Sequence, residues 1–84
     1  MLIEGKVEHK SVAKTGKGRN QVNLIVENEQ GRWFVQVRPK QKDMVMTIEK
    51  GNMVCLTVRN EMKTSTRKDG QEWHYNNLVL EKVA

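Results

Sequence analysis

The segment from Gly31 to Val58 constrains the fold more than any other part of the sequence, because it reads as strand, short helix, strand. Arg32–Arg38 alternates apolar and polar residues, which is typical of a half-buried strand. Pro39 then ends the strand, because proline has no amide hydrogen to donate to a sheet. This order is typical of a small five-stranded barrel with one short helix between its third and fourth strands.

The helix and the fourth strand follow from the same segment. Gln41–Ile48 is expected to form one or two helical turns, with Met44 and Ile48 closing the open end of the barrel. Met53–Val58 is apolar on both faces, which favours a strand covered on both sides or one that contributes to an oligomer contact. Cys55, the one cysteine, is interpreted as a small buried hydrophobic residue.

The remaining strands have weaker patterns. Leu2–Val12 is expected to open the barrel, with Gly5 as the point where this strand bends. Gln21–Asn28 alternates cleanly except at Ile25, and a hairpin turn leads from it to Gly31. Gln71–Val83 closes the sheet, which completes an all-β, five-stranded Greek-key barrel.

Length and charge limit what such a barrel can do. With 84 residues, the chain is expected to form one domain, residues 1–84. A net charge of +5 and a pI near 9.6 favour polyanionic partners. No apolar run is long enough to span a membrane and no signal peptide is recognisable, so we expect no membrane association and a cytoplasmic location.

Two basic segments flank the expected barrel. The loop Ala13–Asn20 contains Lys14, Lys17 and Arg19, and the loop Arg59–Gly70 contains Lys63, Arg67 and Lys68 before an Asp-Gly turn. Two interpretations are open for each segment: a loop surrounded by solvent, or a loop whose basic side chains contact phosphate groups.

Three aromatic residues are candidates for stacking on nucleic-acid bases. If Trp33, Val35 and Val37 enter the core, Phe34 faces outward between Arg32 and Arg38, as in a stacking platform. The alternatives are that a loop or a second subunit covers Phe34, or that a one-residue register slip gives Trp33 this role. Trp73 and Tyr75 share one side of the last strand, where they either stack on bases or cap the core.

The sequence contains little that indicates a catalytic site or a metal site. His9 and His74 lie far apart in the sequence, without the neighbouring ligands that a metal site needs. The Gly-Lys-Gly-Arg-Asn stretch lacks the ending of a phosphate-binding loop and precedes a strand. We therefore expect no enzyme activity, no metal and no cofactor.

The pattern resembles the oligonucleotide-binding (OB) fold, and more narrowly the bacterial single-stranded DNA-binding proteins and primosomal replication protein N. The matching features are the short helix after Pro39-Lys40, the turn Lys50–Val54, the basic hairpin Arg67–Gly70 and a looser match over Gln71–Val79. The resemblance implies a DNA-facing third strand bearing Arg32, Phe34 and Arg38. The resemblance associates an acidic tail with the tetrameric members, and the given sequence ends at Ala84, soon after the last expected strand, so we expect the dimeric primosomal type.

The sequence thus predicts an OB-fold protein that binds single-stranded DNA, or RNA, with little sequence preference, in DNA replication, recombination or repair. A homo-oligomer, most simply a homodimer, is expected. The alternative is an OB-fold interaction module that binds no nucleic acid. The predicted contact residues are Lys14, Lys17, Arg19, Arg32, Phe34, Arg38, Lys40, Lys63, Arg67, Lys68, Trp73 and Tyr75.

Overall fold

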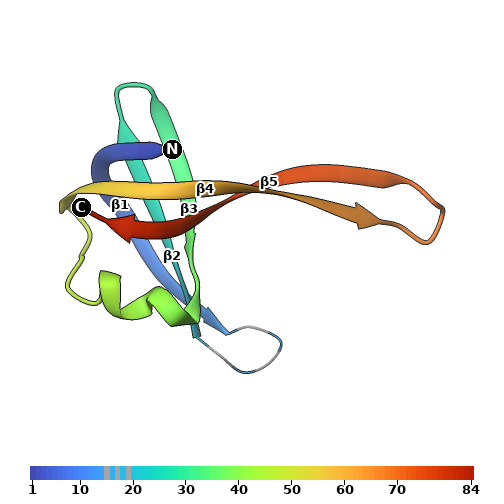
Figure 1. The fold of residues 1–84 in the computed structure, drawn as a ribbon, viewed down its shortest axis with the longest axis horizontal. Helices are drawn as coiled ribbons and strands as arrows, with labels where there is room; N and C mark the ends of the chain where they lie inside the picture. The colour runs from blue at the N-terminus through green and yellow to red at the C-terminus, as the bar shows by residue number, and fades with distance from the viewer. Residues whose placement is uncertain (15, 17, 19) are drawn as a thin grey trace.

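The protein is a closed five-stranded barrel (Figure 1). The computed structural model spans residues 1–84 and describes all of them except 15, 17 and 19 and the side chains of Ala13 and Asn20. The strands follow the order β1-β2-β3-β5-β4 around the barrel, and every pair is antiparallel except β3 with β5. The elements are β1 (Leu2–Lys14), β2 (Asn20–Asn28), β3 (Gly31–Val37), the 3₁₀ helix η1 (Pro39–Val45), β4 (Met53–Thr66) and β5 (Glu72–Val83). The predicted all-β OB architecture, with one short helix between β3 and β4, is confirmed.

Alternation of apolar residues along the strands builds the core. On β2 the alternate residues Val22, Leu24 and Val26 are buried. On β3 the predicted inward residues Val35 and Val37 are fully buried, and Trp33 packs against the core. Phe34 is therefore on the outer face, as expected. The buried hydrophobic residues are Ile3, Val7, Val22, Leu24, Val26, Val35, Val37, Val45, Ile48, Leu56, Val58, Val79 and Leu80.

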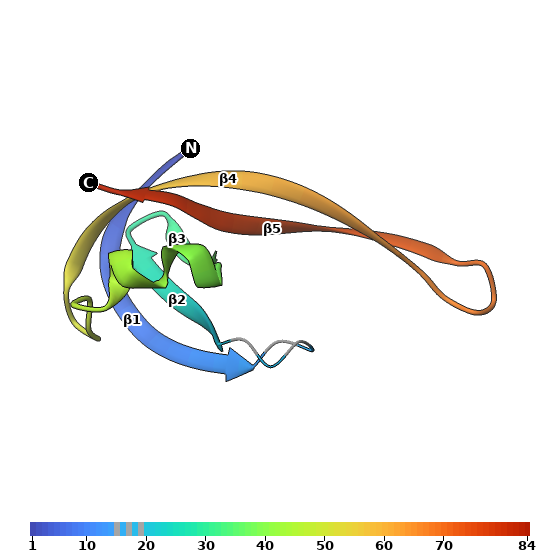
Figure 2. The same ribbon diagram turned by 60° about the horizontal axis from the view of Figure 1, so that its bottom comes forward.

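The helix η1 covers one open end of the barrel, as Figure 2 shows. The expectation that Met44 closes this end is wrong, because Met44 is exposed and Val45 is fully buried in its place. Ile48 follows η1 in a turn in which its amide donates to the Val45 carbonyl oxygen at 3.1 Å, and both residues join the core. The Lys10 ammonium donates to the carbonyl oxygens of both residues, at 2.9 Å each, and fastens the helix to β1.

A bulge in β1 explains why Lys10 reaches this end. The pairing with β2 shifts between Val7 and His9, so that Glu8 is an extra residue and the alternation reverses after it. Lys10 consequently takes an inward position opposite Leu24, and His9 takes an outward one opposite Ile25. β1 can then bend around the barrel and pair with both β4 and β2 (Figure 2).

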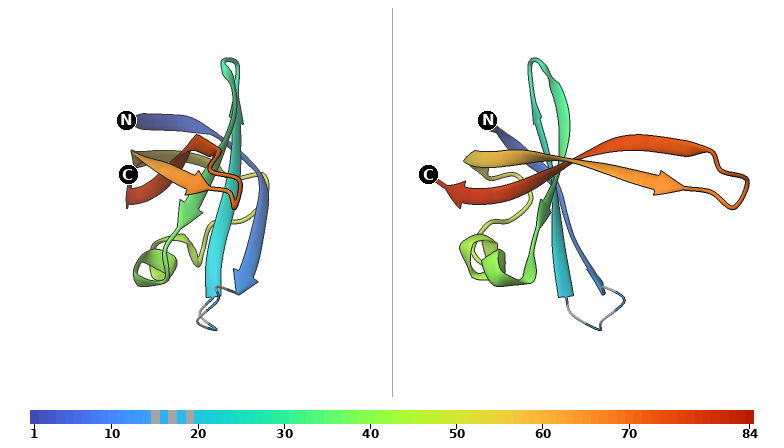
Figure 3. Two further views of the ribbon diagram at one scale, coloured as in Figure 1. Left: turned by 90° about the vertical axis from the view of Figure 1, so that its right-hand side faces the viewer. Right: turned by 45° about the vertical axis from the view of Figure 1, so that its right-hand side comes forward.

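The second basic segment is a β-hairpin rather than a loop. Pairing between β4 and β5 runs out to Thr66 and Glu72, which leaves only residues 67–71 as the connection. The outer part of the hairpin leaves the barrel and projects from it (Figure 1; Figure 3, right). The radius of gyration is accordingly 14.0 Å, against about 12 Å for a compact domain of this length.

Cys55 is not the buried residue that the sequence analysis expected. Leu56 and Val58 occupy the inner positions of β4, so Cys55 faces outward, only partly buried, with its thiol 3.7 Å from a Glu4 carboxylate oxygen. Partial loss of solvent, together with the nearby Glu4 charge, raises the pKa of the Cys55 thiol. Within the described residues, no helix is both long and apolar enough to span a membrane.

The backbone of β1 approaches β2 closely at Gly5, and this supports a first prediction. A Cβ atom at Gly5 would lie 2.9 Å from Val26 Cγ1 and would also overlap the Glu27 carbonyl group. Gly5→Ala is therefore expected to lower the free energy of unfolding by about 1–3 kcal/mol, measured by urea denaturation. Gly16→Ala is the matched control, because a Cβ there would meet no atom within 4 Å. Equal destabilisation by the two changes would contradict the close approach at Gly5.

Candidate nucleic-acid interface

The outer face of β1, β2 and β3 presents an apolar row at the middle of the sheet. His9 pairs with Ile25 and Ile25 pairs with Phe34, and directly opposed residues on neighbouring strands point to the same side. Ile25 is partly buried, whereas His9 is exposed and 52% of Phe34 is exposed. Ile25 therefore supports an accessible aromatic ring from one side. Ile25, the residue that breaks the alternation of β2, is therefore part of this surface.

The charge beside this row is locally balanced at one end. Arg32 lies two residues before Phe34 on β3, and its Nε donates to a Glu8 carboxylate oxygen at 2.7 Å. Glu27 lies directly opposite Arg32 on β2. Glu27 also lies opposite Lys6 on β1, so two acidic and two basic residues meet here and this end of the surface carries little net charge.

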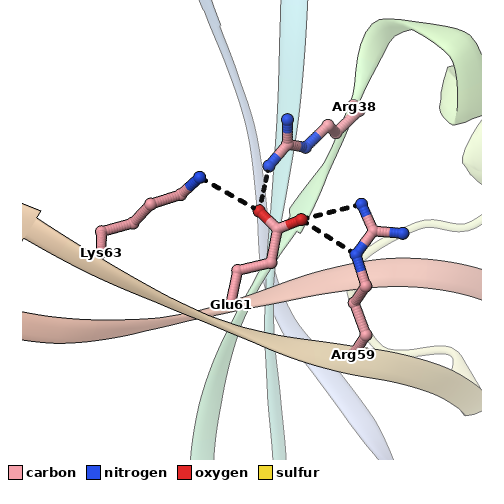
Figure 4. Close-up of polar contacts among 4 residues, drawn as sticks. All are labelled: Arg38, Arg59, Glu61 and Lys63. Carbon is pink, nitrogen blue, oxygen red and sulfur yellow. Dashed lines mark hydrogen bonds and ion pairs between the residues drawn. The ribbon is translucent and has the colours of Figure 1, made fainter.

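At the other end of β3, three cations surround one carboxylate (Figure 4). Glu61 Oε2 accepts from Arg59 Nε at 2.9 Å and lies 2.8 Å from Arg59 Nη2. Glu61 Oε1 pairs with Arg38 and lies 3.4 Å from Lys63 Nζ. These four residues, called here the Glu61 cluster, join the end of β3 to β4 and keep a net charge of +2.

The cluster changes the acidity of its own carboxyl group. Hydrogen bonding from Arg59, with the charges of Arg38 and Lys63, lowers the pKa of Glu61 despite the opposing effect of partial desolvation. Glu61 is therefore ionised at neutral pH.

The projecting hairpin presents the other two aromatic residues. Lys63 pairs with Tyr75, and Ser65 pairs with Trp73, so both rings lie on the same side of the hairpin as Lys63. Trp73 is 47% exposed and Tyr75 is 49% exposed. The Arg67 guanidinium carbon lies 3.7 Å from the Trp73 ring centroid, in a cation–π contact near the tip.

A shallow groove lies where β5 leaves β3. It has a volume of about 480 Å³, and its lining includes Phe34, Asn60 and Asn76. The two amides are exposed and bonded to each other at 3.3 Å. The groove therefore offers polar groups next to an aromatic ring.

The predicted contact residues are only partly gathered together. Phe34, Arg38 and Lys63 lie on the continuous outer surface formed by β3, β5 and β4, and Tyr75 and Trp73 extend it along the hairpin. Arg67 and Lys68 are at the hairpin tip, while Lys14 ends β1 at a separate extremity, as Figures 1 and 3 show. Lys40 is exposed on η1. Lys17 and Arg19 lie outside the described residues.

Sequence reasoning missed three residues of this surface and one residue of the groove beside it. His9 could not be placed on this surface from the sequence, because the bulge at Glu8 reverses the alternation of β1. Arg59 and Glu61 were assigned to a loop, although continued alternation from Val58 would have placed them on the outer face of a longer strand. Asn76, in the groove, has no signal in the sequence that would have indicated it.

Comparisons with known proteins bear on the fold. No family model and no curated protein matches the sequence. Among solved structures, the crystal structure of the mitochondrial single-stranded DNA-binding protein Rim1 from S. cerevisiae is similar, with a TM-score of 0.68 and 14% sequence identity. The alignment covers 100% of this chain and 90% of that chain. The likeness confirms that this chain has the OB fold of such proteins.

The Glu61 cluster supports a second prediction. Arg59→Gln removes the largest cause of the lowered pKa, so the pKa of Glu61 is expected to rise toward its usual value. A folded-state pKa below the unfolded one stabilises the protein above the unfolded-state pKa, and this contribution is lost as the pH falls through the folded-state pKa. In Arg59→Gln, the free energy of unfolding should therefore fall less as the pH is lowered through the folded-state pKa of Glu61.

Both effects can be measured on the same samples. Side-chain carboxyl carbons are followed by NMR as the pH is lowered, and unfolding is measured at each pH. Lys50→Gln removes the same charge from the turn before β4 and should leave the Glu61 titration unchanged. An identical Glu61 titration in wild type and Arg59→Gln would show that the contacts do not persist in solution.

Proposed function

We propose that this protein binds single-stranded DNA, or RNA, with little sequence preference, along the outer face of β3 and the β4–β5 hairpin. The observation that carries the proposal is the exposure of Phe34, Trp73 and Tyr75, each about half accessible, beside cationic side chains. Exposed aromatic rings cost solvation free energy unless a partner covers them, and nucleic-acid bases are flat partners that stack on them.

The chemistry of the surface suits an unpaired strand better than a duplex. Aromatic rings reach bases only when the bases are not enclosed in a double helix, and each stacked base contributes about 1–3 kcal/mol. Exposed lysine and arginine side chains neutralise phosphates without reading sequence. Similarity to a protein described as single-stranded DNA-binding supports the same choice.

The proposal extends to the class of protein, its location and the process in which it acts. We infer a role as a binding protein rather than an enzyme, of the single-stranded DNA-binding or primosomal type, acting in the cytoplasm during replication, recombination or repair. In support, the solved structure to which this chain is similar is described as that of a single-stranded DNA-binding protein.

A third prediction separates stacking from charge. Phe34→Ala should weaken binding of an oligo-dT strand by about 1–3 kcal/mol at every salt concentration, because it removes a ring and no charge. Lys63→Ala should instead reduce the slope of log affinity against log salt by about 0.7, because one phosphate contact is lost. Tryptophan fluorescence titration at several salt concentrations measures both effects.

The controls match each change in chemistry but lie away from the surface. Met46→Ala removes an exposed apolar side chain from the turn after η1, and Lys50→Ala removes a cation from the turn before β4. Neither is expected to alter binding beyond the general effect of net charge. If Phe34→Ala and Lys63→Ala behave like these controls, the binding surface lies elsewhere.

A second candidate function, an interaction module, is favoured by one observation. The outer surface of β1 and β4 exposes Leu2 and Met53, at 58% and 74%, beside an open groove of about 1280 Å³. A second copy of the chain is the simplest partner for this surface, and it would produce the expected homodimer. This surface lies on the pair β1–β4, so a dimer there leaves the outer face of β3 accessible.

A fourth prediction tests this surface. Size-exclusion chromatography with light scattering is expected to give the mass of a dimer for wild type and of a monomer for Met53→Lys. Oligo-dT should add mass to both forms if the dimer and the nucleic-acid surface are independent. A wild-type monomer would contradict the dimer, and an oligomer that never binds oligo-dT would favour the interaction module.

A further inference from the structure

Glu61 is surrounded by more positive charge than it can neutralise. Arg38, Arg59 and Lys63 all direct nitrogen atoms to its carboxylate, and Figure 4 shows them arriving from three sides. Building on the proposed function, we propose that the Glu61 cluster is a phosphate-binding subsite, which the Glu61 carboxylate occupies until the nucleic-acid backbone takes its place.

The geometry of the contacts matches what a phosphate requires. Arg59 offers two nitrogens, Nε and Nη2, to the same carboxylate oxygen at 2.9 and 2.8 Å, and a phosphate oxygen accepts such contacts equally well. Arg38 and Lys63 share the second oxygen. The Glu61 carboxylate therefore occupies, between two guanidinium groups and an ammonium group, the position that a phosphate group would take.

Solvent exposure shows that the cations remain reachable while Glu61 holds them. The Glu61 side chain is 22% exposed, whereas the side chains of Arg38, Arg59 and Lys63 are 44%, 50% and 45% exposed. The carboxylate thus lies on the inner side of the cluster, and the outer sides of its donors face solvent. An incoming phosphate can meet the cations without any movement of the strands.

The position of the cluster links the two groups of aromatic residues. Glu61 pairs with Asn77 on β5, and the next residue of β5, Leu78, pairs with Val35 of β3, adjacent to Phe34. Lys63, at the other end of the cluster, pairs with Tyr75. A strand that stacks on both rings must carry its backbone over or beside Glu61.

It follows that Glu61 limits affinity. Its negative charge repels the phosphate and competes for the same donors, so the cluster contributes a charge of +2 instead of +3. The Arg32 end of β3 is balanced instead, because Glu8 pairs with Arg32 and Glu27 lies between Arg32 and Lys6 of β1. The phosphate path is therefore expected to follow the Glu61 cluster rather than the Arg32 end of β3.

The experiment uses Glu61→Gln, which keeps the size and one acceptor oxygen of the side chain but removes its charge. Glu61→Gln is expected to bind oligo-dT roughly fivefold more tightly than wild type, as removal of one nearby like charge implies. It should also steepen the salt slope by up to about 0.7, because one more phosphate is neutralised. Inorganic polyphosphate serves as a second probe, since it has the charge but no bases to stack.

Matched controls isolate the position of the charge. Glu49→Gln makes the same change in net charge at an exposed site in the turn before β4, and it should tighten binding much less. Arg59→Gln should weaken binding of both probes. Circular dichroism of each variant verifies that the fold is retained.

The outcomes distinguish this inference from the function on which it rests. Tighter binding of both probes by Glu61→Gln supports the phosphate subsite. Tighter polyphosphate binding without any oligo-dT binding would keep the subsite and reject the nucleic-acid function. Unchanged or weaker binding of polyphosphate by folded Glu61→Gln would overturn the proposal, because Glu61 would then hold the cations in place rather than compete with phosphate.

Discussion

The short parallel contact between β3 and β5 is the constraint on which the rest of the structure depends. Only Val35 with Leu78 and Gln36 with Val79 are paired there, yet this contact closes the barrel. Every other strand pair is antiparallel, and three of these pairs join strands that follow one another directly in sequence. Without the β3–β5 contact, Val35 and Leu80 would face solvent and Arg38 would lie far from Glu61.

The brevity of this contact also produces the projecting hairpin. Before Leu78 in the sequence, β5 has no partner except β4, so the two strands continue away from the barrel as a two-stranded ribbon. A ribbon of this kind has no core on either face and is marginal by itself. Its cross-strand contacts are small ones, such as Thr64 with His74 at 2.9 Å and Arg67 over Trp73. Its exposed rings are therefore explained better by a function outside the fold than by stability.

Much of the barrel could be predicted because one face of each strand is buried. Alternation placed Val35 and Val37 inside and Phe34 outside, and Pro39 marked the end of β3 correctly. One failure occurs where the local geometry departs from the assumed period. Met44 was assigned to the core with α-helical spacing, whereas the 3₁₀ helix buries Val45.

The candidate site was harder to predict than the fold, because a surface depends on which strands become neighbours. Arg38 and Glu61 lie 23 residues apart and meet only after the barrel closes. The hairpin was interpreted as a loop because Arg59–Thr66 has no apolar face, and a strand that buries nothing has no hydrophobic period to recognise. The pairing of cations with aromatic rings could be expected from composition, but the carboxylate among them could not.

The distribution of charge along β3 gives the proposed path a direction. At its start, Arg32 is matched by Glu8 and faces Glu27, so an approaching phosphate meets almost no net charge. Past its end, Arg38 belongs to a cluster in which cations outnumber the carboxylate. Coulomb attraction over these distances is only partly screened at physiological salt. A polyanion that stacks on Phe34 is therefore drawn toward the hairpin and away from the β2–β3 turn, which places Tyr75 and Trp73 next along its way.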